Sequence, residues 1–359
     1  MANAGSSDSQ SAIHELELLC VGNAIVDVFG RDVNGLALRY GLCEPVQHVE
    51  IEKLQNLLGE LGETTVVSGG GAANVAKIAG LLGAKAGFTG AIGDDRYGRL
   101  FGEDLKAAGV RTFLVQKPLP TGLCLVLQTG EGTRIAASPS AALDFSEDDI
   151  REEEARKAKV VVIDGFMMGR HGIVRRLLAL ANQHGTAAAI DLGSTAIANE
   201  EAAEIAAYVK SHIASNAASH AKQHPIFLFM NEDEAVSFYD ALNKPVAAFE
   251  ETLGFFKSLT KEKPFPVIVV KMGRRGALCF ADGDCFNAGT EAVQPMETTG
   301  AGDAFCGAFL AAWVRGKSLV ECAAIGNKAA RIVLGGVGTR VDKDAFKDLA
   351  VLLEGSTSP

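Results

Sequence analysis

One glycine-rich stretch combines the residue types that phosphoryl transfer requires. The sequence reads Glu297-Thr298-Thr299-Gly300-Ala301-Gly302-Asp303, and an apolar helical pattern runs from Asp303 to Val314. The first turn of a helix carries unpaired backbone N–H groups and a partial positive charge. Small residues let an anion approach those groups closely. The stretch is therefore expected to bind a phosphate, or the charge that develops while one is transferred.

The role of Asp303 at this helix start must differ from anion binding. A carboxylate does not bind an anion, but beside an anion site it can accept the proton of an attacking hydroxyl. The alternative is that Asp303 only stabilises the positive end of the helix, as many first-turn carboxylates do. The Thr-Thr-Gly-Ala-Gly run before Asp303 favours the general base.

Two further stretches lie where strands are expected to end. Gly69, Gly70 and Gly71 follow the strand-like run 65–67 and open a helix in which Asn74 occupies the first turn, where its amide suits sugar hydroxyls. Gly22-Asn23-Ala24-Ile25-Val26-Asp27 follows the first strand, and Asp27 there could accept hydrogen bonds from a polyol. A tight turn capped by Asn74 and a solvated loop Asp27 are the simpler interpretations of each stretch taken alone.

A third strand end carries Asn231 and Glu234. They lie three residues apart and so on one helical face, and acidic residues beside a nucleotide normally imply a divalent cation. Asn and Glu at this spacing are also a common helix cap, which is the stronger interpretation without other information.

Alternating strand and helix patterns must position these residues. The strand-like runs are 18–21, 65–67, 160–163, 187–190, 226–229 and 267–270, and the helical patterns are 72–82, 99–108, 172–183, 200–212, 232–239, 247–259, 303–314, 320–334 and 345–353. This order predicts an α/β fold of three layers, α/β/α, with parallel strands joined by right-handed crossovers. Continuous apolar runs such as 160–163 suit strands that are covered on both faces.

Residues 29–49 and 111–137 depart from this rhythm, and we expect them to meet as a small antiparallel sheet outside the main layers. A hairpin is expected at 277–280 and 284–287, turned by Asp282-Gly283. Residues 1–15 are small and polar, without the apolar core of a signal peptide, so a disordered tail is predicted before a domain over 16–355.

Composition narrows the function classes. The 359 residues include 34 Lys and Arg against 44 Asp and Glu, a net charge of −10 that argues against nucleic acid as the main partner. No apolar run approaches the ~20 residues of a membrane span. The seven cysteines are scattered without a CxxC pair, which predicts free thiols in a reducing cytoplasm. The seven histidines show no zinc-ligand spacing.

Taken together, the motifs resemble the ribokinase family, also called PfkB carbohydrate kinases, over roughly residues 17–355. The first family signature resembles Gly69–Asn74 continued through 87–98, and the second is the Thr-Thr-Gly-Ala-Gly-Asp loop. The resemblance implies a ribokinase-like fold, in which a mostly parallel central sheet carries a small β-sheet lid. It implies in-line transfer of the ATP γ-phosphate to a hydroxyl, with lid closure excluding water.

Site roles carried over from this resemblance fall into three groups. Asp303 would be the catalytic base, with the amides of Gly300, Ala301 and Gly302 as an anion hole. Asn23, Asp27, Gly70, Gly71 and Asn74 would surround the substrate hydroxyls. Lys271, Gly273, Gly276 and Asn327 would meet ATP, while Asn231 and Glu234 would order Mg²⁺ and phosphates through water.

The resemblance leaves the substrate and some partners open. Relatives activated by K⁺ often carry Asp before Thr-Thr, and Glu297 stands there in this chain, so potassium activation stays open. The segment Tyr40–Pro45 looks like the adenosine kinase branch, while Gly69–Ala76 looks equally like sugar kinases. A nucleoside is slightly preferred to an unphosphorylated sugar, a non-catalytic sugar or nucleotide sensor is the second alternative, and either a monomer or a lid-mediated homodimer is expected.

Overall fold

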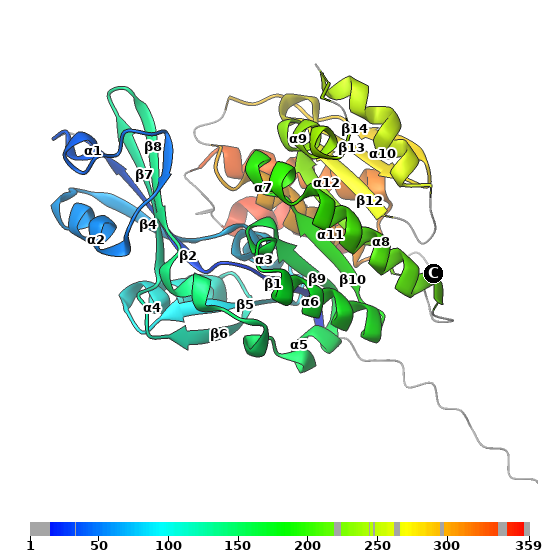
Figure 1. The fold of residues 1–359 in the computed structure, drawn as a ribbon, viewed down its shortest axis with the longest axis horizontal. Coiled ribbons are helices and arrows are strands. Elements are labelled where there is room, and N and C mark those ends of the chain that lie inside the picture. The colour runs from blue at the N-terminus through cyan, green and yellow to red at the C-terminus, as the bar shows by residue number, and fades with distance from the viewer. Residues whose placement is uncertain are drawn as a thin grey trace, which may run out of the picture.

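The computed structural model describes residues 15–32, 34–218, 224–243, 245–246, 248–261, 266–294, 298–336 and 343–354. The predicted tail falls almost wholly on residues 1–14, and Glu297 is also outside the described residues. Figure 1 shows a large body and a smaller β-rich lobe beside it. The body contains a nine-stranded sheet between helices, and the lobe contains a five-stranded sheet.

The large sheet has the strand order β14-β13-β12-β11-β10-β9-β1-β5-β6. Its strands are β1 (Leu16–Val21), β5 (Ala86–Gly93), β6 (Arg111–Lys117), β9 (Ala158–Asp164), β10 (Ala187–Asp191), β11 (Ile226–Asn231), β12 (Pro266–Lys271), β13 (Ala277–Ala281) and β14 (Asp284–Ala288). The strands from β6 to β12 pair in parallel, and β13 and β14 form the antiparallel hairpin predicted at this edge. The α/β/α fold class is confirmed.

Helices cover both faces of this sheet, because alternate strand residues point to opposite faces. In β9, Val160 and Val162 pack into one core cluster, whereas Val161 and Ile163 pack into the other. One face carries α3 (Gly71–Leu81), α4 (Arg96–Ala107), α11 (Ala301–Trp313), α12 (Leu319–Leu334) and α13 (Lys347–Glu354). The other carries α5 (Glu152–Lys157), α6 (His171–His184), α7 (Thr195–Glu200), α8 (Ala202–Ala218), α9 (Glu232–Leu242) and α10 (Leu253–Leu259).

The small sheet has the order β3-β8-β7-β2-β4. Its strands are β2 (Ile25–Arg31), β3 (Val46–His48), β4 (Thr64–Gly69), β7 (Gly122–Thr129) and β8 (Gly132–Ser138), with α1 (Leu36–Arg39) and α2 (Ile51–Glu60) between its strands in the sequence. The sheet is mixed rather than antiparallel, because β2 pairs with β7 and β3 pairs with β8 in parallel.

Two strands, β4 and β6, lie in a different sheet from the one that the sequence predicted for them. Residues 112–115 were expected in the small sheet, but β6 extends the large sheet beside β5. Its alternation arises because it is an edge strand, with Phe113 buried and its neighbours partly exposed. Residues 65–67 were expected among the main strands, but β4 pairs antiparallel with β2 in the small sheet. Strand periodicity gives a strand's faces and not its partner.

Candidate active site

The N-terminus of α11 places Asp303 in the first helical turn. Gly300 is the N-cap and adopts a left-handed φ of 80°, and the helix begins at Ala301, two residues before the predicted start. The bond from the Ala304 amide to the Gly300 carbonyl is 2.9 Å. The amides of Ala301, Gly302 and Asp303 precede this first full helical bond, so they belong to the positively polarised end of the helix.

Burial and neighbouring charges tune the Asp303 carboxyl. Burial raises its pKa, and the nearby negative charge of Asp191 raises it further. A 2.8 Å hydrogen bond from the Asn74 amide and the charge of Lys271 act in the opposite direction. The resulting pKa is about 7, which suits a group that must both accept and release a proton near neutral pH.

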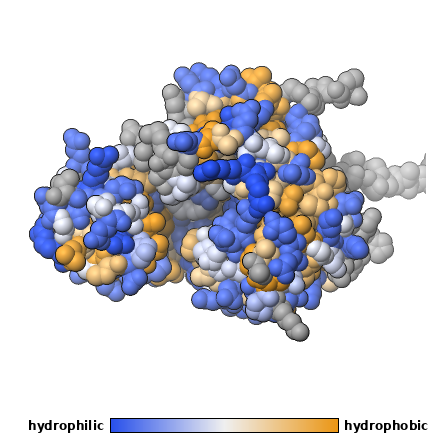
Figure 2. All heavy atoms as spheres, turned by 90° about the horizontal axis from the view of Figure 1, so that it is seen from above, coloured by the Kyte–Doolittle hydropathy of each residue, from blue (hydrophilic) through white to orange (hydrophobic). Residues whose placement is uncertain are grey.

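Two cavities meet at Asp303, Asp191 and Gly193, which border both. The larger, of about 610 Å³, is bordered by Asp303, by two predicted anion-hole residues and by the residues predicted to meet ATP or magnesium: Ala301, Gly302, Asn231, Glu234, Lys271, Gly273, Gly276 and Asn327. The smaller, of about 230 Å³, is bordered by Asp303 and by Gly71, Ala72, Asp164, Phe166, Asp191, Gly193 and Gly300. We call these the donor cavity and the acceptor cavity. Figure 2 shows a hollow between the smaller lobe and the large body.

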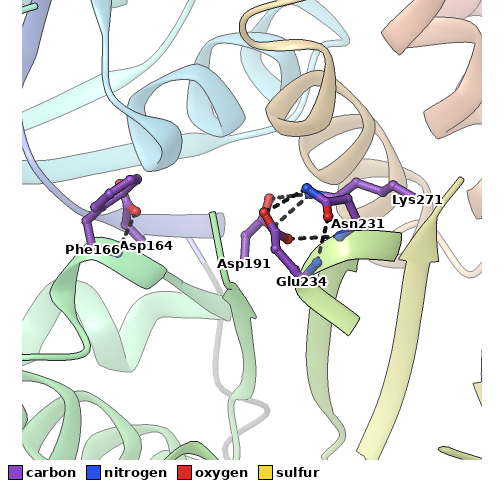
Figure 3. A network of polar contacts seen from close by, with 6 residues as sticks. All are labelled: Asp164, Phe166, Asp191, Asn231, Glu234 and Lys271. Atoms are coloured by element: carbon purple, nitrogen blue, oxygen red, sulfur yellow. Dashed lines mark hydrogen bonds and ion pairs between the residues drawn. The ribbon is translucent and has the colours of Figure 1, made fainter. Parts of the chain in front are cut away.

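Two polar pairs stand at neighbouring strand ends along the donor cavity (Figure 3). The Lys271 ammonium contacts both carboxylate oxygens of Asp191, at 2.8 and 3.0 Å. Burial alone would lower the pKa of Lys271, but Asp191 and Glu234 outweigh it and raise the pKa. Gly302 lies close enough that an added Cβ would stand 3.2 Å from Nζ of Lys271. Lys271 therefore brings a permanent cation to the start of α11.

Asn231 and Glu234 form a reciprocal helix cap at the start of α9. The Asn231 backbone amide and side-chain amide each donate a 2.8 Å hydrogen bond to Glu234, and the Glu234 amide returns one of 2.8 Å. Both carboxylate oxygens of Glu234 are thus occupied within the cap. Burial raises the pKa of Glu234.

The predicted hydroxyl-binding residues cluster at the junction between the two sheets. Gly70 has a φ of 89°, and a Cβ added there would stand 2.2 Å from the Asn23 carbonyl oxygen. The Asn23 side chain accepts a hydrogen bond from Arg170. The buried Asp27 lies in β2, and Asn74 in α3 donates to Asp303. Gly71 borders the acceptor cavity, whereas Asn23, Asp27, Gly70 and Asn74 are not among the residues lining either of these two cavities.

Comparison with known proteins identifies the family of the chain. The family model described as pfkB family carbohydrate kinase matches residues 37–345. The chain belongs to the PfkB carbohydrate kinase family. It is therefore a phosphotransferase that acts on a hydroxyl group, and ATP use is expected for the family.

Individual relatives of this PfkB kinase differ in their substrates. The chain is 27% identical to "Adenosine kinase" of Schizophyllum commune over 344 residues, covering 90% of this chain and 96% of that protein. It is 26% identical over 296 residues to "5-dehydro-2-deoxygluconokinase" of Shouchella clausii, covering 80% of this chain and 86% of that one. The crystal structure of adenosine kinase from Sinorhizobium meliloti superposes with a TM-score of 0.78 at 23% identity, covering 95% of this chain and 99% of that chain. The ribokinase-like fold is confirmed.

Sequence reasoning missed Asp164 and Asp191 in this PfkB kinase. Each is the last residue of a buried parallel strand, β9 and β10, and each borders the acceptor cavity. A signal was present, because each carboxylate directly follows an apolar run and a glycine follows within two residues. Ligands gather at the carboxyl ends of such strands. Burial raises the pKa of Asp164 to about 6, although the amides of Phe166 and Ala72 donate to it.

The donor set fits a magnesium ion held through water better than one bound directly. Across the described part of the chain, no three His, Cys, Asp or Glu side chains gather as a metal site. Asn231 and Glu234 border the donor cavity with their oxygens engaged in the helix cap, a geometry that suits bound water rather than direct ligation.

Among the described helices, none has the length and apolar character that crossing a membrane requires.

Proposed function

We propose that this PfkB kinase transfers the γ-phosphoryl group of ATP to a hydroxyl of an adenosine-like nucleoside, with Asp303 as the general base. The observation that carries the proposal is that Asp303 borders both the donor and the acceptor cavity. A hydroxyl in the acceptor cavity and a phosphate in the donor cavity would then meet at this carboxylate. In-line transfer needs this geometry, because the nucleophile and the leaving group must stand on opposite sides of the phosphorus.

The surrounding residues have distinct roles in this proposal. Asp303 accepts the proton of the attacking hydroxyl, and the amides of Gly300, Ala301 and Gly302 face the charge that develops on the transferring group. Lys271 adds a fixed cation beside Gly302. Asp191 holds Lys271 in place through its 2.8 Å ion pair. Gly273, Gly276 and Asn327 border the nucleotide.

Magnesium would be held by Asn231 and Glu234 through water. When bound, it supplies positive charge to the phosphates of ATP. The raised pKa of Glu234 reflects its burial, and the charge of Lys271 works against that rise. The hydrogen bonds between Asn231 and Glu234 fix both side chains, so the pair forms an ordered polar surface where the phosphates of ATP would lie.

Phe166 supports a nucleoside acceptor. Its side chain is 53% exposed although its neighbours Met167 and Met168 are fully buried. It borders the acceptor cavity, and Gly193 opposite leaves room, because an added Cβ would stand 3.3 Å from the Phe166 ring. An exposed aromatic ring at a cavity rim suits stacking on a flat base. Asp27 and Asn74, with Asn23, Gly70 and Gly71 around them, would hold the ribose hydroxyls at the edge of the acceptor cavity, which Gly71 borders and where Asn74 donates to Asp303.

A sugar kinase is the second candidate, since relatives named 5-dehydro-2-deoxygluconokinase match most of this chain. The acceptor cavity is bordered by three aspartates, Asp164, Asp191 and Asp303, and the residues lining it include no cation. Lys271 pairs with Asp191, and the pKa values of Asp303 and Asp164 are about 7 and about 6, so the negative charge of this wall is reduced, but no side chain lining it is a cation that could pair with a carboxylate or a phosphate. A neutral sugar is therefore the competing acceptor to the nucleoside.

ATP consumption with adenosine, inosine, cytidine, ribose and fructose tests this proposal. We expect adenosine to give the highest kcat/KM and the turnover to depend on Asp303. A higher kcat/KM with ribose or fructose would transfer the assignment to the sugar kinase. Full turnover in a folded Asp303→Asn variant would overturn the role of the base.

A further inference from the structure

Lys77 is a buried cation that the proposed chemistry leaves unexplained. It lies in α3, one helical turn after Asn74, and only 4% of it is exposed. Its ammonium contacts the Ser68 carbonyl at 3.3 Å, the Ser68 hydroxyl at 3.0 Å and the Asp104 carboxylate at 3.0 Å. Burying the Lys77 ammonium costs desolvation that an apolar side chain would avoid, whereas the Asp104 side chain is 37% exposed. A lysine here therefore calls for a reason beyond joining two helices.

The contacts of Lys77 converge on the end of β4, where the small sheet joins the large body. The same Asp104 oxygen that contacts Lys77 also accepts from the Ser68 amide at 3.0 Å and from the Ser68 hydroxyl at 2.5 Å. Asp104 belongs to α4 and Ser68 to β4. Lys77 and Asp104 thus grip one residue, Ser68, from two different helices of the large body.

Asp27 lies against the next residue of that strand. β2 and β4 pair antiparallel with Val26 opposite Ser68 and Ile25 opposite Gly69. A Cβ added to Gly69 would stand only 2.1 Å from Oδ2 of Asp27, so the carboxylate occupies the space that a side chain would fill. Lys77 therefore contacts the carbonyl of Ser68, and Asp27 lies over the α-carbon of the next residue, Gly69.

Charge links the two side chains as well. Burial lowers the pKa of Lys77, and the negative charges of Asp104 and, to a smaller extent, of Asp27 favour its ammonium form. Asp27 is 8% exposed and so has little water to stabilise its charge. Asp27 and Asp104 are both acidic, and Lys77 is the cation that acts on both. Removing that cation would take away a positive charge that acts on both carboxylates.

We propose that Lys77 is a positioning residue whose positive charge and hold on Ser68 keep the Asp27 carboxylate fixed against Gly69, ready to accept hydrogen bonds from the hydroxyls of the acceptor. This inference rests on the proposed function, which places Asp27 at those hydroxyls. Lys77 would act through Asp27 and would not touch the substrate. Its effect should appear in acceptor recognition and not in ATP recognition.

Three variants separate this role from a purely structural one. Lys77→Met removes the cation, and Lys77→Gln removes the charge but keeps a hydrogen-bond donor, so Lys77→Gln serves if Lys77→Met does not fold. Ser68→Ala is the matched control, because it removes the hydroxyl that Lys77 contacts while leaving Lys77, its bond to the Ser68 carbonyl and its Asp104 partner in place. We expect both Lys77 variants to raise the KM for the acceptor about tenfold or more, and Ser68→Ala to raise it less than about threefold, with the KM for ATP unchanged in all three.

The dependence on hydroxyls provides a second readout. Calorimetric binding of adenosine and of its 2′-deoxy and 3′-deoxy analogues, without ATP, should show discrimination in the unaltered protein and its loss in Lys77→Gln. In a double-mutant cycle, adding Asp27→Asn to Lys77→Gln should cost little more than either change alone. An equal acceptor KM for Lys77→Gln and Ser68→Ala, or additive effects in the cycle, would overturn the role of Lys77. Absence of turnover in the unaltered protein would instead refute the kinase substrate proposed above, and the binding data would still test Lys77.

Discussion

The side-chain amide of Asn74 donates a 2.8 Å hydrogen bond to the carboxylate of Asp303. Asn74 belongs to α3, which follows the triple glycine, and Asp303 belongs to α11, which follows the Gly-Ala-Gly loop. The two glycine-rich motifs, far apart in the sequence, thus meet through their first helical turns. An amide donor favours the ionised carboxylate and fixes its direction, so Asn74 prepares Asp303 to accept a proton.

Replacement of Asp303 tests the general base. Asp303→Asn keeps the size of the side chain but cannot accept the proton, so turnover should fall by at least about 100-fold, the lower end for such groups. ATP affinity should be retained, because the helix amides and Lys271 stay in place. Initial rates and calorimetric ATP binding check this, with the exposed Asp148→Asn as a control of equal chemistry. Comparable rates in both variants would remove Asp303 from catalysis.

The pKa of about 7 at Asp303 predicts a dependence of kcat/KM on pH. Only the ionised form can act as a base, so the rate should decline about tenfold for each pH unit below 7. Because the charge of Asp191 raises the pKa of Asp303, Asp191→Asn should move this acidic limb toward lower pH. Rate profiles between pH 5 and 9 measure both. A limb that stays in place, or moves upward, would contradict the electrostatic coupling.

Gly70 should tolerate no side chain. Its φ of 89° disfavours other residues, and an added Cβ would stand 2.2 Å from a backbone oxygen. Gly70→Ala should therefore lower the free energy of unfolding by about 2 kcal/mol or more. Gly59→Ala is the matched control, because Gly59 lies in α2 with nothing within 4 Å of the new methyl group. That change should stabilise by about 0.5–1 kcal/mol, and thermal or denaturant unfolding of both variants provides the comparison.

Removal of the Phe166 ring should separate nucleosides from sugars. Phe166→Ala should raise the KM for adenosine about tenfold, since stacking on a base contributes about 1–3 kcal/mol, while any activity on ribose should be unaffected. Phe286→Ala removes a ring that is 39% exposed on β14 and should leave both unchanged. Steady-state kinetics with the two acceptors decides. If adenosine and ribose are affected equally, the ring has another role.

Much of the fold could be predicted because its signals are local. Apolar runs gave the buried strands, and the Asp282-Gly283 turn gave the hairpin of β13 and β14. The assignment of β4 and β6 to their sheets was wrong because it depends on distant pairing. β6 follows α4 and returns parallel to β5, whereas β4 turns back against β2 before α3 begins. Neither pairing can be predicted from the alternation of apolar and polar residues within the strand itself.

The site divides in the same way. Glycine-rich helix starts pointed to Asp303 and to the donor cavity because sequence neighbours build them. Asp164 and Asp191 were missed because they enter the acceptor cavity only when β9 and β10 lie beside each other in the sheet. The bond between Asn74 and Asp303 could not be predicted either, since it requires two helices from distant segments to converge.

The chain passes between the two sheets at residues 22–24, at Gly70, at 118–121 and at Pro139. Each crossing is only a few residues long, so four short connections, rather than one long linker, join the five-stranded sheet to the large body. A sheet joined by four short connections can tilt relative to the large body, but it cannot move far from that body or rotate freely. Opening and closing should therefore cost little chain entropy and return the sheet to the same alignment in every cycle.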